Sequence, residues 1–275
     1  MSATAVAFEL AGADDRPIRG DALVAESATA AVVLCHGFKG FARWGFFPYL
    51  AGKLAAAGLT VVSFDFSTSG VGADRETFTE PDAFAANTFG KQVADVRTVW
   101  REGEKRGWLA VPTGLFGFSR GGGIVVLYTA SESHVRALVT WSAIATVDRW
   151  PPHVRQEWRA RGYVDVTNAR THQTLRVGTD FLDEIEQKAE TELNILDAAA
   201  RVRVPWLIVH GVADETVPVH ESRQLHTASH DRAEMMLVER ASHTYGFKHG
   251  AAEVSADLAA ATDRTVRFFQ SNLVG

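Results

Sequence analysis

A chain of 275 residues, 46% of them hydrophobic, is long enough to bury a large core and lies within the length of a single α/β domain. Its 28 basic and 33 acidic residues give a net charge of −5 without a basic block, which argues against nucleic acid or a membrane as partner. The single cysteine, Cys35, excludes an intrachain disulfide. Without a signal peptide pattern or an apolar run of about 18 residues, the expected location is the cytoplasm.

The chain begins with two alternating segments, 4–10 and 21–26, which predict an antiparallel hairpin around the polar turn 11–20. The pattern then changes to short, continuous apolar runs typical of strands buried on both faces, at 30–35, 59–64, 113–118, 136–141, 205–210 and 233–239. Helical patterns lie between or after these runs, at 48–58, 91–107, 123–133, 220–228 and 255–273. This alternation predicts an α/β fold with a mostly parallel, doubly wound sheet.

An insertion at about 145–204 interrupts this alternation between the fourth and fifth buried runs. It is several times longer than an ordinary connection, so we expect it to be structured. Residues 154–162 favour a helix, 163–177 a hairpin, and 180–202 one or two amphipathic helices. We therefore expect one domain over 1–275, with the insertion as a cap that covers the site and selects the substrate.

The sequence Gly117-Phe118-Ser119-Arg120-Gly121 matches a nucleophile elbow, because a predicted strand precedes it and a helix follows it. Glycines are expected there because the tight turn brings neighbouring backbone close to the serine. A serine between glycines can also occur by chance in a chain with 23 glycines. The strand–turn–helix context favours a nucleophilic role for Ser119.

A serine nucleophile needs a base and a carboxylate to orient that base. His243 lies between the last apolar run and the final helix, and Asp214 lies four residues past the run 205–210. Either residue alone could be an ordinary loop or turn residue. The chain order Ser119, Asp214, His243 is that of a hydrolase triad, so we predict these three residues as catalytic.

An oxyanion hole is predicted from His36-Gly37-Phe38, which follows the run 30–35. The backbone N–H groups of Phe38 and Arg120 are the expected donors, and His36 is expected to support the loop. The ten histidines show no helical ligand spacing with a carboxylate, so no metal site is predicted.

With these motifs, the chain resembles the serine α/β-hydrolases over nearly its whole length. The segment HGFKGFARWGFFPYLAGKLAAAGLTVVSFDFSTSGVG is similar to the cinnamoyl/feruloyl-esterase-like and dienelactone-hydrolase-like groups. The resemblance implies an acyl-enzyme on Ser119, no cofactor, and an insertion over the active site. Dienelactone hydrolases proper have a cysteine nucleophile where this chain has Ser119, and Cys35, inside a predicted strand, is interpreted as a small core residue.

Aromatic residues near these motifs are candidates for substrate binding. We assign this role to Trp44, Trp141 and Trp150, although each could equally pack the core or hold the insertion together. The predicted function is a carboxylesterase with a small ester as its partner, and feruloyl or cinnamoyl esters are one candidate class. A peptidase or amidase with the same triad, and a non-catalytic binding protein on this fold, remain alternatives, as does a homodimer.

Overall fold

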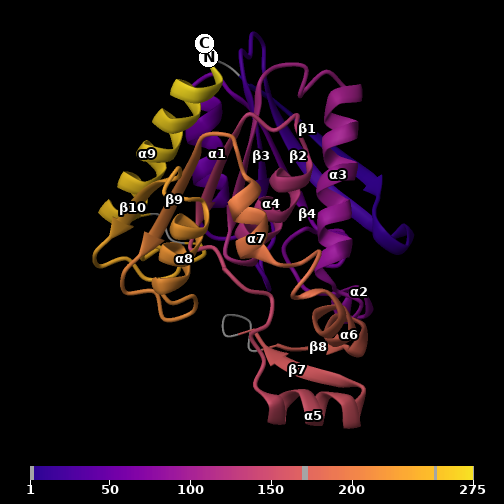
Figure 1. Ribbon diagram of the computed structural model, residues 1–275. Helices are drawn as coiled ribbons and strands as arrows, with labels where there is room; N and C mark the ends of the chain where they lie inside the picture. The colour runs from indigo at the N-terminus through magenta and orange to yellow at the C-terminus, as the bar shows by residue number, and fades with distance from the viewer. Residues whose placement is uncertain (1–2, 169–172, 251–252, 275) are drawn as a thin grey trace.

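The computed structural model describes residues 3–168, 173–250 and 253–274. Within them, eight strands form one sheet in the order β1-β2-β4-β3-β5-β6-β9-β10 (Figure 1). The strands from β4 to β10 in this order are parallel, whereas β2 pairs antiparallel with both β1 and β4. The strands are β1 (Ala3–Ala11), β2 (Pro17–Ala25), β3 (Ala31–Cys35), β4 (Thr60–Asp65), β5 (Thr113–Phe118), β6 (Ala137–Trp141), β9 (Trp206–Gly211) and β10 (Glu234–Val238). The predicted sheet and its N-terminal hairpin are confirmed.

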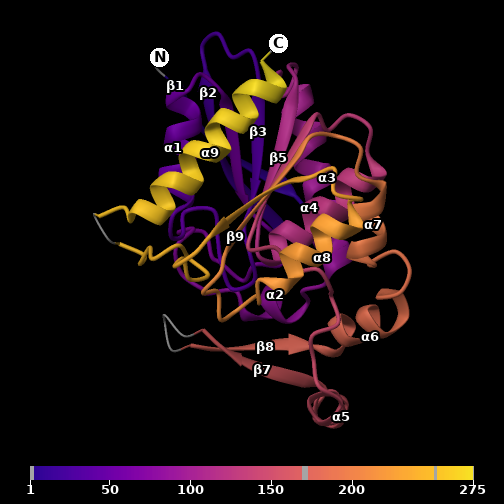
Figure 2. The same cartoon turned by 60° about the vertical axis from the view of Figure 1, so that its left-hand side comes forward.

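The continuous apolar runs of the central strands follow from burial on both faces of the sheet. Every residue of β3, β5, β6 and β9 is buried. Helices α1 and α9 cover one face, and α3, α4, α7 and α8 cover the other (Figure 2). These helices are α1 (Phe47–Ala56), α3 (Phe89–Lys105), α4 (Arg120–Ser131), α7 (Ile195–Arg201), α8 (His220–Ala228) and α9 (Ala256–Leu273). None of the helices in the described ranges has the length and apolar character to cross a bilayer.

The N-terminal hairpin has a shorter turn than the predicted 11–20. Strand β2 already begins at Pro17, opposite Ala11, and only a 3₁₀ turn over Ala13–Asp15 separates the strands. The side chain of Ile18 is fully buried, and Gly20 leaves room for the Phe8 ring, which a β-carbon at that position would contact at 2.1 Å. Alternating burial along β2 therefore extends the strand into the polar stretch.

The insertion between β6 and β9 contains α5 (Pro152–Arg161), β7 (Tyr163–Thr167), β8 (Thr174–Gly178) and α6 (Thr179–Lys188), followed by α7. We call residues 152–168 and 173–188 the outer segment, because they lie off the end of the main sheet (Figure 1). Helix α7 instead packs on α4 and α8. The turn of the predicted hairpin at 169–172 lies outside the described residues, and the organisation as one domain with a cap stays a prediction.

The parallel strands end at the same edge of the sheet, which gathers the predicted site residues. Cys35 at the end of β3 pairs with Gly117, and Phe118 at the end of β5 pairs with Trp141. The loops after β3, β5, β9 and β10 therefore leave from one side of the sheet, as is typical of ligand sites in open α/β sheets. The short helix α2 (Pro81–Ala85), which no periodicity predicted, contacts strand β8 of the outer segment.

Replacing Gly121 by alanine tests how closely α4 approaches β3. A β-carbon there would lie 2.4 Å from the carbonyl oxygen of His36 and 2.6 Å from that of Cys35. Because backbone must move, we expect Gly121→Ala to lower the free energy of unfolding by about 1–3 kcal/mol. The control is Gly52→Ala on the exposed side of α1, where nothing lies within 4 Å. That variant should gain about 0.5–1 kcal/mol. Urea denaturation of both variants measures the difference, and equal stabilities would contradict the packing described.

Candidate active site

Ser119 occupies the turn between β5 and α4 in a strained conformation. Its φ of 57° and ψ of −121° lie outside the regions that residues with a side chain normally adopt. The Ser119 N–H donates to the Trp141 carbonyl at 2.9 Å, and the Ser119 carbonyl accepts from the N–H of Gly122 at 3.0 Å. These bonds hold the backbone while the hydroxyl points out of the sheet toward His243.

Of the three residues predicted as a triad, His243 lies within hydrogen-bonding distance of both others. His243 Nε2 is 3.2 Å from Ser119 Oγ, and His243 Nδ1 is 2.7 Å from Asp214 Oδ2. A carboxylate can only accept, so Nδ1 carries the proton and Nε2 is free to accept from the serine hydroxyl. This arrangement can activate a serine nucleophile.

Asp214 is fixed and kept ionised by its surroundings. Its side chain is fully buried, and Oδ1 accepts from the N–H groups of Thr216 and Val217, each at 2.9 Å. Burial acts to raise the pKa of Asp214, but the hydrogen bond to His243 and these two backbone donors outweigh it and lower the pKa. The carboxylate is therefore charged at neutral pH.

A second histidine, His210, lies beside Asp214 on β9. Its Nε2 is 3.5 Å from Asp214 Oδ2 and donates to the Val217 carbonyl at 2.8 Å. Burial lowers the pKa of His210, so this imidazole is neutral at pH 7. It therefore braces the loop that carries Asp214 without adding a charge that would compete with His243.

The loop after β3 lies against Ser119, as the predicted oxyanion hole requires. A β-carbon on Gly37 would be 3.0 Å from the Ser119 β-carbon. Within the described residues, the Phe38 N–H has no hydrogen-bond acceptor in the protein. The Arg120 N–H belongs to the first turn of α4, where the helix supplies no partner. Two backbone donors are thus available next to the serine.

This loop is anchored by buried polar contacts. His36 Nδ1 donates to the Gly37 carbonyl at 2.8 Å, and His36 Nε2 accepts from the Phe66 N–H at 3.2 Å. Asp65 accepts from the Ala42 N–H at 2.6 Å and from Arg75 Nε at 2.9 Å. Sequence patterns did not single out Asp65 or Arg75, whose partners lie far apart in the chain.

A cavity of about 1240 Å³ opens above Ser119 and His243. Trp44 and Trp150, two of the residues assigned to substrate binding from the sequence, lie in its wall. The assignment of Trp141 to this wall is wrong. Trp141 is fully buried on the α9 side of the sheet, where its indole N–H donates to the Thr265 hydroxyl at 2.9 Å. Other wall residues, for which no motif gave a signal, include Phe89, Phe181 and His249.

Cys35 lies in the core of β3, as the sequence predicted for it. It is fully buried, and burial raises the pKa of its thiol, which disfavours the reactive thiolate. Among residues 3–168, 173–250 and 253–274, no three His, Cys, Asp or Glu side chains gather as candidate metal ligands.

Comparison with known proteins identifies the family to which the sequence belongs. The model of the family described as serine aminopeptidase, S33 (Hydrolase_4) matches residues 26–191, which is more than half of the chain. No curated protein sequence matches the chain significantly.

Solved structures share the fold at low sequence identity. The esterase domain of a Rhodothermus marinus protein is 18% identical, with 99% of this chain and 100% of that chain covered and a TM-score of 0.68. Est1E from Butyrivibrio proteoclasticus, with ferulic acid bound, is 16% identical over 98% and 100%, with a TM-score of 0.76. Dienelactone hydrolase from Anabaena variabilis is 15% identical over 99% and 100%, with a TM-score of 0.59.

The family match covers the loop after β3, the turn at Ser119 and most of the insertion, and the structural neighbours share the sheet that carries them. The chain belongs to the S33 serine aminopeptidase family of the α/β-hydrolase superfamily.

Proposed function

We propose that this hydrolase cleaves carboxylic esters through an acyl-enzyme on Ser119. The observation that carries the proposal is the series of two hydrogen bonds, Ser119 to His243 to Asp214, beside two N–H donors for which the described residues supply no acceptor. An ester carbonyl placed at Ser119 would lie within reach of both donors. The hydrolases and esterases with the same fold are consistent with this chemistry.

In the proposed first step, Ser119 Oγ bonds to the carbonyl carbon while its proton passes to His243 Nε2. The oxyanion accepts from the Phe38 and Arg120 N–H groups, and Asp214 stabilises the imidazolium. Collapse breaks the ester C–O bond, and His243 returns the proton to the leaving alcohol. Water then attacks the acyl-enzyme with the same histidine as base, which releases the acid and restores Ser119.

The wall of the cavity suits an apolar or aromatic acyl group. Phe41, Trp44 and Trp150 line it, and the outer segment contributes Val166 and Phe181. Feruloyl or cinnamoyl esters are therefore our first candidates, and Est1E, which has the same fold, binds ferulic acid. The outer segment acts as the cap that selects the acyl group in this proposal.

An aminopeptidase is the second candidate, because the family carries that description. Such an enzyme needs a carboxylate near the site to hold the ammonium group of its substrate, and Glu76 and Glu215 both line the cavity. Either carboxylate could serve that purpose, so turnover of both substrate classes must decide between an ester and a peptide substrate.

Turnover of matched esters and anilides tests the proposed reaction. We expect p-nitrophenyl acyl esters, including a feruloyl ester, to be hydrolysed with a much higher kcat/KM than aminoacyl p-nitroanilides. The matched control is Ser119→Ala, which should reduce ester turnover by about 10⁴-fold or more. A preference for anilides would favour the aminopeptidase, and activity retained by the control would show that Ser119 is not the nucleophile.

Chemical labelling distinguishes Ser119 from the only thiol. A fluorophosphonate should modify Ser119 of the folded protein, because His243 activates its hydroxyl. Iodoacetamide should leave Cys35 unmodified until the protein is denatured, because the thiol is buried and its pKa is raised. Intact mass and peptide mapping locate both adducts. Rapid alkylation of native Cys35, with Ser119 unlabelled, would refute the assignment of the nucleophile.

Replacing Asp214 by asparagine tests the carboxylate. The amide oxygen of the new side chain can still accept from the Thr216 and Val217 N–H groups, so the loop should remain folded. Its NH₂ group would face His243 Nδ1 and favour the wrong tautomer, so we expect kcat to fall by up to about 10⁴-fold. A thermal melt checks the fold. Near-normal turnover of folded Asp214→Asn would move the assignment to Asp148, which follows β6.

A further inference from the structure

The side chain of Arg120 is enclosed at the wall of the cavity, immediately after the proposed nucleophile. The residue is 7% exposed. Its guanidinium carbon lies 4.0 Å from the centre of the Phe38 ring and 4.7 Å from those of Phe89 and Phe181. These three aromatic residues and Arg120 all line the cavity, so the group they form is part of its inner surface. We call this group the arginine cage.

The charge of Arg120 is not neutralised by direct contact. Its Nη1 donates to the amide oxygen of Asn87 at 2.6 Å, but no carboxylate of the described residues lies within 4.0 Å. Burial lowers the pKa of Arg120 and the nearby Glu184 offsets part of this effect, which leaves the pKa at about 9. The guanidinium therefore remains a cation at neutral pH. The nearby Glu184 is itself engaged, because its oxygens accept from the N–H groups of Phe89 at 2.7 Å and Gly90 at 3.0 Å.

The geometry of the cage restricts what can bind to Arg120. Aromatic rings pack around the guanidinium, so a further ligand must approach along its edge. Only one of its five N–H donors is used by a described residue. A carboxylate matches the edge of a guanidinium with two parallel hydrogen bonds. Another cation at the wall, Arg149, is already paired with Glu221 at 2.5 Å.

We infer that Arg120 is a specificity-determining residue that binds a carboxylate of the substrate, so that the enzyme prefers esters carrying a second, free carboxylate near the scissile carbonyl. This inference rests on the proposed ester hydrolysis. The carboxylate can belong to the acyl group or to the alcohol, because Arg120, Ser119 and His243 line the same cavity and both parts of an ester bound at Ser119 would lie in it. Its binding would supply the missing counter-charge inside the cavity.

Matched pairs of esters test the preference and show which side carries the carboxylate. The acyl pair is monoethyl glutarate and ethyl pentanoate, which differ by a carboxylate on the acid part. The alcohol pair is butanoyloxyacetate and propyl butanoate, which differ by a carboxylate on the alcohol part. Chromatography of the products measures the turnover of all four esters. We expect the ratio of kcat/KM, anionic over neutral, to exceed about 10 in at least one pair. A ratio near or below one in both pairs would overturn the inference, even if neutral esters are hydrolysed well.

The variants Arg120→Met and Arg120→Lys separate recognition from packing. Methionine removes the charge but keeps apolar volume in the cage, so the fold should persist, as a thermal melt will verify. Arg120→Met should lower the ratio by about 10²-fold, and Arg120→Lys by less, because it keeps the charge without the planar fork. The ratio cancels any effect on the oxyanion hole that both esters share. Equal slowing of both esters would mean that Arg120 only packs the site.

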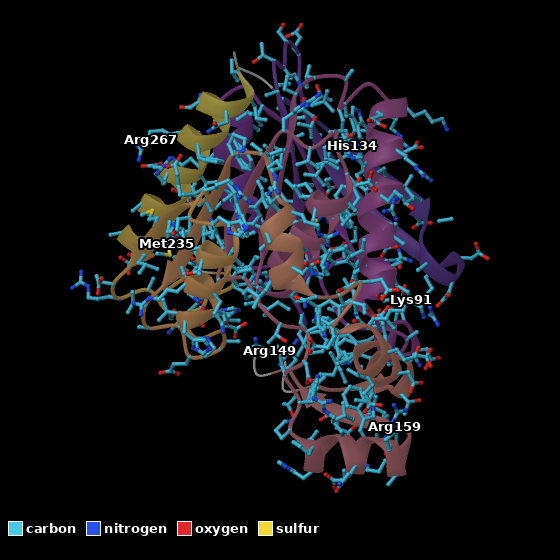
Figure 3. The ribbon with its side chains drawn as sticks, viewed as in Figure 1. Lys91, His134, Arg149, Arg159, Met235 and Arg267 are labelled. Atoms are coloured by element: carbon cyan, nitrogen blue, oxygen red, sulfur yellow. The ribbon has the colours of Figure 1, made fainter. Side chains whose placement is uncertain are left out.

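The charge control is Arg159→Met, which removes a cation far from the cavity. Arg159 lies on α5 at the far side of the outer segment (Figure 3). Arg159 is not in the cavity wall, and the ratio should stay within about 2-fold of the wild type.

Binding without turnover keeps the test independent of the proposed reaction. In Ser119→Ala protein, monoethyl glutarate or butanoyloxyacetate should raise the melting temperature, and adding Arg120→Met should abolish that shift. If no ester is hydrolysed but this shift occurs, the ester proposal fails and the carboxylate site stands. If neither anion shifts the melting temperature, the carboxylate site is refuted.

Discussion

The strained turn at Ser119 is the constraint on which the rest of the site depends. Its backbone, with a φ of 57°, leads into Gly121, which packs directly against the carbonyl groups of Cys35 and His36. That contact brings the first turn of α4 against the loop after β3, so the N–H groups of Phe38 and Arg120 lie beside the same hydroxyl. The order of strands in the sheet, with β3 next to β5, is what makes this contact available.

The electrostatics of the site follow from how each buried group is neutralised. The carboxylate of Asp214 accepts hydrogen bonds from two backbone N–H groups and from His243. The neighbouring His210 stays neutral, so it places no positive charge beside His243. Near the loop after β3, Arg75 is paired with both Asp65 and Asp21. Arg120 differs from these groups, since aromatic rings and an amide surround its charge. In the proposed function, the charges on the catalytic side of the site are therefore compensated, and the charge of Arg120 is left to bind the substrate.

Local sequence patterns predicted those features that depend on neighbours in the chain. Ser119 and Asp214 follow the buried strands β5 and β9, and His243 follows β10, which is only partly buried. Parallel pairing brings the ends of these strands to the same edge of the sheet. The side of Trp141 could not be predicted, because β6 is buried on both faces and carries no polar alternation. Helix α2 is too short for a periodic signal.

The arginine cage also had no local signal. Asn87 and Phe89 lie just before and at the start of α3, whereas Phe181 lies on α6, so these residues meet Arg120 only in the folded chain, and no spacing in the sequence encodes that meeting. Asp65 and Arg75, which are ten residues apart, also gave no local signal, because Asp65 anchors the loop that contains Ala42 by a hydrogen bond that forms only in the folded chain.

The contact of Glu184 with the first turn of α3 has a consequence for how molecules reach the cavity. Glu184 lies on α6, and its carboxylate binds the positive end of a 17-residue helix through two backbone N–H groups. Swinging the outer segment away would break these charge-assisted bonds and also separate Phe181 from Arg120. We therefore expect the outer segment to stay in place as part of the cavity wall, so that small molecules exchange without a gating motion.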